Sequence, residues 1–183
     1  MATITKPNTF LQRLVGAAAL DTAIYEEVEA DRGAIGQAFL IVVMSSVAAG
    51  IGMTGINRPS VVAIPMLSIF ALMAWAAWAL LTFVLGTQVF GEPQTRSDVG
   101  ELLRTLGFAA TPGWLQVIGL IHAAAMPVFV ITQVWMLAAT VVAVRQALDY
   151  TSTARAIAVC VCGWVLTIGL AAVLGLVFAP PVS

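Results

Sequence analysis

The chain has 183 residues, of which 61% are hydrophobic and only 9% carry a charge. A water-soluble domain carries about 25% charged residues, so the composition excludes a soluble globular protein. The formal net charge of −1 gives no reason to expect binding to nucleic acid.

Two short helices are predicted before the first long apolar run. Thr9 can cap a helix from Phe10 to about Ala19, and Asp21 can cap a second helix. Their apolar faces are too short to cross a bilayer, so we expect both helices to lie along the inner membrane surface. A frayed terminus is the alternative. We therefore predict cytoplasmic interfacial helices over residues 1–33.

Five apolar runs follow, and none of them contains Asp, Glu, Lys or Arg. A helix of about 20 apolar residues spans a bilayer core, and each run is near that length. The predicted fold class is therefore all-α: a polytopic membrane protein with five transmembrane helices over residues 34–178 and a short outer tail at 179–183. The runs are Ile35–Met53, Val61–Thr87, Thr105–Ile121, Pro127–Val144 and Ala156–Val177.

The third run is the weakest of the five predictions. Pro112 should kink this helix and free the carbonyl of Phe108, which Thr111 or another helix could satisfy. Runs three and four could instead form a re-entrant hairpin. Residues 122–126 are predicted to join these two runs as a tight turn.

Charged residues alternate between the segments that connect the runs. Seven of the eight basic residues and all nine acidic residues lie in the N-terminus or in the segments after runs two and four, and only Arg58 lies on the opposite side. This asymmetry is typical of cytoplasmic loops, so it predicts a cytoplasmic N-terminus and an outer C-terminus. Arginine outnumbers lysine seven to one. That bias fits a GC-rich bacterial genome and suggests the bacterial cytoplasmic membrane.

An acidic cluster stands just before the first run. It is either a solvated helix face that pairs with Arg32, Arg104, Arg145 or Arg155, or a docking patch for the basic surface of a cytoplasmic partner. Two surface ion pairs, Glu101 with Arg104 and Arg145 with Asp149, are also expected from their helical spacing. The cluster consists of Glu26, Glu27, Glu29 and Asp31.

The last run carries small residues at intervals of four. Such a stripe lets two helix backbones approach closely in lipid. It serves either packing within the chain's own bundle or a homodimer face. The stripe consists of Gly163, Thr167, Ala171 and Gly175.

Polar and aromatic side chains lie unusually deep in the runs. All five tryptophans are inside apolar runs rather than at the membrane boundary, where only Tyr150 is expected. Packing and helix-to-helix hydrogen bonds explain them, or they line a cavity for a lipid or a solute. The residues expected to contact such a guest are Gln116, Gln133, Trp114 and Trp135.

Catalysis has no recognisable motif in this chain. Cys160 and Cys162 point to different sides of a helix, and the single histidine, His122, is predicted at the opposite membrane face. We therefore predict a protein that is not an enzyme, with no cofactor and no metal site.

Three segments resemble the bacterial branch of the Yip domain family: Ala19–Gly52, Leu106–Pro112 (LGFAATP) and Val141–Arg155. LGFAATP is similar to the glycine–aromatic–alanine–x–x–proline signature of that family, and residues 31–34 match its Asp-Leu-x-Gly-Pro motif in part. The resemblance implies a five-span fold with a cytoplasmic N-terminus. In eukaryotes it also implies binding of prenylated Rab GTPases, a partner that bacteria lack.

These observations predict a scaffold or membrane organiser, or an accessory subunit of a membrane complex. Its partners would be membrane lipids, a cytoplasmic or intramembrane protein of unknown identity, or a second copy of the chain. The alternative is a carrier for a small solute or a lipid, with a cavity between runs three and four.

Overall fold

The computed structural model describes residues 7–57, 63–93, 95 and 98–178, and for positions 57, 168 and 170–178 it describes the backbone alone. Every regular element in these ranges is helical, as the apolar runs predicted. The α-helices are α1 (Phe10–Ala18), α2 (Thr22–Ala30), α3 (Ile35–Asn57), α4 (Ala63–Val84), α5 (Val99–Ala109), α6 (His122–Ala147) and α7 (Thr153–Phe178). Three further pieces are the 3₁₀-helices η1 (Arg32–Ala34) and η3 (Thr111–Leu120) and the π-helix η2 (Leu85–Val89).

The predicted helix caps are confirmed. Thr9 forms a capping box with Gln12 at the start of α1, and the side chain of Asp21 accepts from the backbone N–H of Ala23 in α2. Asp98 caps α5 in the same way as Thr9 caps α1. Each cap satisfies backbone N–H groups that a helix start leaves unpaired.

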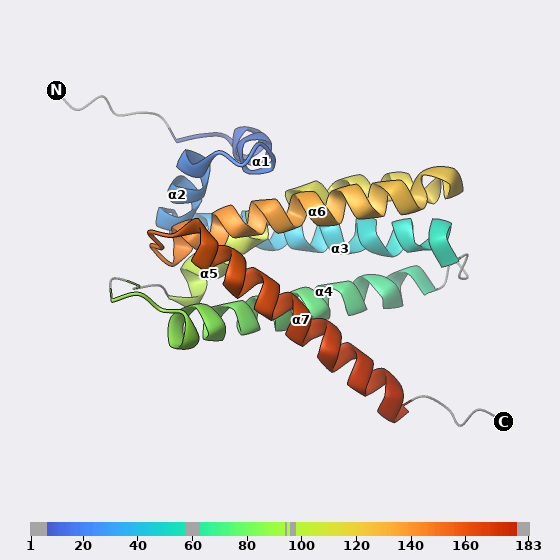
Figure 1. The fold of residues 1–183 in the computed structure, drawn as a ribbon. Coiled ribbons are helices and arrows are strands. Elements are labelled where there is room, and N and C mark those ends of the chain that lie inside the picture. The colour runs from blue at the N-terminus through green and yellow to red at the C-terminus, as the bar shows by residue number, and fades with distance from the viewer. Residues whose placement is uncertain (1–6, 58–62, 94, 96–97, 179–183) are drawn as a thin grey trace.

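The long helices lie side by side, while α7 crosses them diagonally (Figure 1). The α3 helix is the centre of the bundle, because α4, α5, η3 and α6 all contact it. The two N-terminal helices sit at one end, where α1 packs against α5 and η3, and α2 packs against α5 and α6.

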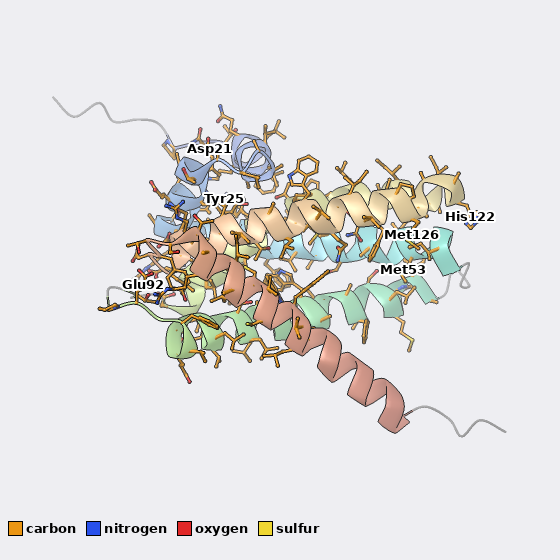
Figure 2. The ribbon with its side chains drawn as sticks, viewed as in Figure 1. Asp21, Tyr25, Met53, Glu92, His122 and Met126 are labelled. Carbon is orange, nitrogen blue, oxygen red and sulfur yellow. The ribbon has the colours of Figure 1, made fainter. Side chains whose placement is uncertain are left out.

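The charged side chains gather at one end of the bundle. Asp21 and Glu92 lie at the end that carries the N-terminal helices, and His122 lies at the other (Figure 2). Arg58, the basic residue expected on the outer side, and the tail at 179–183 are outside the described residues.

Within the described residues, three helices are long and apolar enough to cross a membrane: Arg32–Ile56, Ala63–Val89 and His122–Ala147. The described part of α7 adds a shorter apolar helix, Thr153–Thr167. The chain is thus built as a multi-pass membrane protein.

The third segment changes helix type at the predicted break. The α5 helix ends at Ala109, and Pro112 stands in the first turn of η3. The hydroxyl of Thr111 donates to the carbonyl oxygen of Phe108 over 2.6 Å, as one of the sequence alternatives proposed. A 3₁₀-helix rises about 2.0 Å per residue, so η3 lengthens the segment by about 20 Å.

The turn after η3 is tighter than residues 122–126 suggested, because α6 already begins at His122. Ile121 alone, in an extended conformation, separates the two helices. The Nδ1 atom of His122 contacts the carbonyl oxygen of Gly55 near the end of α3. The third segment therefore reaches the same end of the bundle as α3.

Glycines form a close seam between α3 and the third segment. A Cβ atom at Gly107 would lie 2.6 Å from the Cβ of Ala38, and one at Gly113 would lie 3.1 Å from the Cβ of Ser45. A Cβ at Gly119 would lie 3.0 Å from the Cα of Gly52. Backbone approach this close gives the helices the packing contacts that hold them together in lipid.

Two hydrogen bonds cross the same seam. The Ser45 hydroxyl donates to the Ala110 carbonyl oxygen over 2.7 Å, and the Trp114 indole donates to the Ile41 carbonyl oxygen over 3.1 Å. The first bond reaches the backbone between α5 and η3, and the second reaches the backbone within α3. We call residues 38, 45, 52, 107, 113 and 119 the glycine seam.

We predict that Gly52→Ala destabilises the protein by about 2 kcal/mol, because the added methyl group collides with the carbonyl oxygen of Gln116. Gly36→Ala on the same helix is the matched control, since nothing lies within 4 Å of its Cβ position. That control should leave stability unchanged or raise it by up to about 1 kcal/mol. Thermal unfolding in detergent measures both, and equal effects would contradict the role of the seam.

Candidate functional site

Arg13 clamps the N-terminal helices together. Its side chain is 5% exposed and forms ion pairs of 2.8 Å with both Glu27 and Asp31. A further bond of 3.2 Å joins its Nη1 atom to the Oε1 atom of Gln37 in α3. The Arg13 guanidinium holds the pKa of Asp31 below its ordinary value. Two of the four predicted docking carboxylates are therefore engaged inside the protein.

Arg104 joins α5 to the end of α2. Its Nε atom donates to the carbonyl oxygens of Val28 and Glu29, each over 3.1 Å, and its Nη2 atom also contacts that of Glu29. These carbonyls belong to the last turn of α2, which has no partners for them within the helix. The guanidinium therefore acts as a cap that is supplied by another helix.

The two predicted surface ion pairs are absent from the described part of the chain. Glu101 accepts instead from the backbone N–H of Asp98 over 3.0 Å, which closes the capping box of α5. Arg145 donates to the carbonyl oxygen of Tyr150 over 3.5 Å. Helical spacing predicted the wrong partners, because Glu101 bonds to the backbone at the helix cap and Arg145 bonds to a backbone carbonyl.

A hollow of about 430 Å³ lies beside α2 at the charged end of the bundle. Its walls come from α2, α5, the last turn of α6 and the residue pair that follows α6. We call it the acidic hollow, because four carboxylates converge on it. It is lined by Glu26, Glu29, Ala30, Glu101, Gln146 and Asp149.

The carboxylates of the acidic hollow have different surroundings. Glu26 accepts a hydrogen bond of 2.8 Å from the Nε2 atom of Gln146. Burial raises the pKa of Glu29 from 4.5 to about 7, and the negative charges of Asp149 and Glu101 add to the rise. Arg104 opposes it only in part. Of the predicted docking residues, Glu26 and Glu29 thus line the hollow, whereas Glu27 and Asp31 bind Arg13.

Metal-binding geometry is not found in the part of the chain that the structure describes, where no group of three or more His, Cys, Asp or Glu side chains could hold an ion. Cys160 is buried and Cys162 half-buried, both as free thiols. The four carboxylates of the acidic hollow form a surface of negative charge.

A second concave region lies among the long helices. It comprises two adjoining cavities of about 230 and 460 Å³ that share five residues of α4, α6 and the α5–η3 junction. We call their union the intramembrane groove. The smaller cavity is its tryptophan end, walled by Trp75, Trp78 and Trp164. The larger one, which we call the open end because no described residue of α7 lines it, extends between α3 and α4 as far as Met53.

The groove contains the two predicted glutamines. The Nε2 atom of Gln116 donates to the Oε1 atom of Gln133 over 3.2 Å and lies 3.9 Å from the sulfur of Met136. Gln116 is only 7% exposed. The predicted pair is therefore brought together, and both members line the open end.

The two predicted tryptophans lie elsewhere. Trp114 donates to α3 across the glycine seam, and Trp135 donates to the carbonyl oxygen of Ala18 over 2.7 Å at the end of α1. Neither lines the groove. Tyr150, expected at the membrane boundary, is only 3% exposed and donates to the carbonyl oxygen of Gly86 over 2.6 Å.

The small-residue stripe begins on the inside of the bundle. A Cβ at Gly163 would lie 3.2 Å from the Nε1 atom of Trp78 and 3.5 Å from the Oγ1 atom of Thr82, so this glycine packs on α4. Thr167 lines the tryptophan end of the groove. The side chains at 171 and 175 are outside the described residues, so the lower stripe stays a prediction.

An all-α bundle of apolar helices with its charges gathered at one end defines a multi-pass membrane protein. The model of one family, the Yip1 domain, matches residues 2–175, which is nearly the whole chain. The chain belongs to the Yip1 domain family, as its sequence motifs suggested. No curated protein and no solved structure matches it significantly.

We predict that Arg104→Met loosens α2 from the bundle. Methionine keeps an apolar side chain in place, but it leaves the Val28 and Glu29 carbonyls without a donor, at a cost of about 1–3 kcal/mol. Amide hydrogen exchange in α2 should rise accordingly. Arg32→Met is the control, because that side chain is exposed. Equal protection of the α2 amides from exchange in both variants would contradict the role of Arg104 as a cap.

Docking of α2 should weaken as the pH rises from about 4.5 to 7. In that window the docked Glu29 holds a proton that the undocked one has lost, because its pKa is about 7 in the fold and 4.5 outside it. Protons therefore favour the docked state. Hydrogen exchange of α2, corrected for intrinsic rates, measures this dependence. Glu29→Gln should flatten it, and a slope that survives this change would exclude Glu29 as its source.

Proposed function

We propose that this chain is a non-enzymatic, five-span protein of the bacterial cytoplasmic membrane that gathers a cytoplasmic partner at its acidic hollow. In this view its N-terminus is inside, its C-terminus is outside, and α5 together with η3 makes the third crossing. The role is that of a scaffold or membrane organiser, or of an accessory subunit in a larger membrane complex. The Yip1 family is not known for enzymes, which agrees with this role.

The acidic hollow carries the proposal. Its carboxylates come from three segments that are distant in sequence, and the Arg104 cap fixes α2 against α5 beside them. A preformed surface with one sign of charge attracts and orients a partner of the opposite sign. A basic surface on a cytoplasmic protein fits these requirements.

Membrane topology supports the same assignment. The described charged groups gather at one end of the bundle (Figure 2), and the distribution of basic residues along the sequence favours the cytoplasm for that end. The acidic hollow is therefore the favoured site for the recognition of another protein outside the bilayer.

We predict that the combined change Glu26→Gln, Glu29→Gln and Asp149→Asn abolishes partner binding while the fold is kept. Asparagine suits position 149, where φ is 51°. Purification from native membranes in mild detergent, with mass spectrometry, should recover a partner with the unchanged protein. Its recovery should fall at high salt, because surface charges are screened.

Asp21→Asn is the matched control, because it removes an acidic charge away from the hollow while asparagine caps a helix as well as aspartate does. The control should retain the partner. An unchanged protein that purifies as a monomer without a reproducible partner would refute the proposal. So would the same partners, at the same yield, with the triple variant.

A carrier for a small solute or a lipid is the second candidate function, because the intramembrane groove offers a guest a place among the helices. Pumps and ion-coupled carriers usually bury an ionisable group at such a site. None of the described residues that line this groove is ionisable. The groove therefore supports lipid binding better than ion-coupled transport.

A further inference from the structure

Two glutamine side chains with unused hydrogen-bonding capacity line the intramembrane groove. Each glutamine side chain has a carbonyl oxygen that accepts and an amino group that donates. The bond from Gln116 to Gln133 leaves the Oε1 atom of Gln116 and the amino group of Gln133 without a partner among the described residues. The Gln116 side chain is more than nine-tenths buried.

These atoms lie deep within the apolar part of the bundle. Gln133 is the twelfth of the 26 residues of α6, so it stands near the middle of that helix. Water is scarce at the corresponding depth of a bilayer, and a polar group without a partner there costs several kcal/mol. A bound molecule that offers both an acceptor and a donor removes that cost.

The lining restricts the charge of such a molecule. Apart from the glutamines, the groove is lined by apolar residues, serines and threonines, and none of the described residues at either end is ionisable. A charged headgroup would be buried without a counter-ion, which is strongly unfavourable. The lining therefore favours an uncharged guest over an anionic phospholipid or an ionic solute.

The groove is accessible from the side, where lipid surrounds the bundle. The α7 helix contributes Trp164 and Thr167 to the tryptophan end but no described residue to the open end. It runs away from α6 along its second half (Figure 1). A lipid can therefore enter between α4 and α6 without leaving the membrane.

We propose that the intramembrane groove binds a diacylglycerol, an uncharged lipid with one free hydroxyl group and two acyl chains. Its hydroxyl donates to the Oε1 atom of Gln116, and an ester carbonyl accepts from the amino group of Gln133. The two ends of the groove hold the upper parts of the two chains. A quinone offers only acceptors and a triacylglycerol lacks a donor, so each would leave Gln116 unsatisfied. The site is independent of the acidic hollow and of its partner.

The test uses the full chain in phosphatidylcholine nanodiscs. Brominated dioleoylglycerol quenches tryptophan fluorescence at short range, and Trp75, Trp78 and Trp164 line the groove. Saturable quenching is expected, with displacement by unlabelled dioleoylglycerol. Trioleoylglycerol, dioleoylphosphatidylglycerol and a long-chain ubiquinone should displace it at least tenfold less well. Quenching that never saturates, or equal displacement by any of these three lipids, would overturn the proposal.

Two changes locate the site. Gln116→Leu combined with Gln133→Leu removes both hydrogen bonds and should weaken binding about tenfold. Ala74→Phe fills the junction of the two cavities and should abolish saturable quenching. Their controls are Gln88→Leu and Ala77→Phe, at exposed positions of η2 and α4 that do not line the groove. Binding that is unaffected by both test changes, or is equally reduced by their controls, would place the lipid elsewhere.

Discussion

Close backbone contact between α3 and the third segment is the constraint on which the rest of the bundle depends. Along α3 the seam positions recur every seven residues, which is about two turns of an α-helix. Along the third segment its glycines recur every six residues, and the interval from Gly113 to Gly119 is two turns of the 3₁₀-helix η3, whereas Gly107 lies in α5. Within η3 this interval advances by about 12 Å, which is close to the advance of about 10.5 Å along α3. A continuous α-helix in the third segment would rotate those glycines away from α3.

Two arginines extend this framework beyond the membrane-spanning helices. Arg13 joins α1 to α2 and α3, and Arg104 holds the last turn of α2 against α5. Both side chains are buried, so their bonds are shielded from salt far more than those of an exposed pair. The acidic hollow is a consequence of this docking, because Glu26 and Glu29 reach Asp149 only when α2 lies on the end of the bundle.

Local features were predictable from the sequence, and distant partners were not. The caps at Thr9, Asp21 and Asp98 depend only on residues within one helical turn. The long helices were predicted from the length of the apolar runs. Arg104 meets Glu29 across 75 positions, and Trp135 meets Ala18 across 117, which no local pattern encodes. Two signals were nevertheless present and were missed. Arg13 occupies an apolar-stripe position between Phe10 and Ala17, and the seam glycines recur every six residues instead of four.

The hydrogen bonds of α7 explain why the groove opens to the lipid. Arg155 pairs with Glu92 at 3.1 Å and donates to the carbonyl oxygen of Phe90, and Thr151 bonds to the same carboxylate. These bonds hold the first turn of the helix and the residues just before it. Further along, Gly163 faces Trp78 and Thr82, whose polar side-chain atoms are buried without a partner in the part of the chain that the structure describes. Because polar attachment is concentrated at one end, α7 can diverge from α6 while the seam between α3 and η3 remains closed.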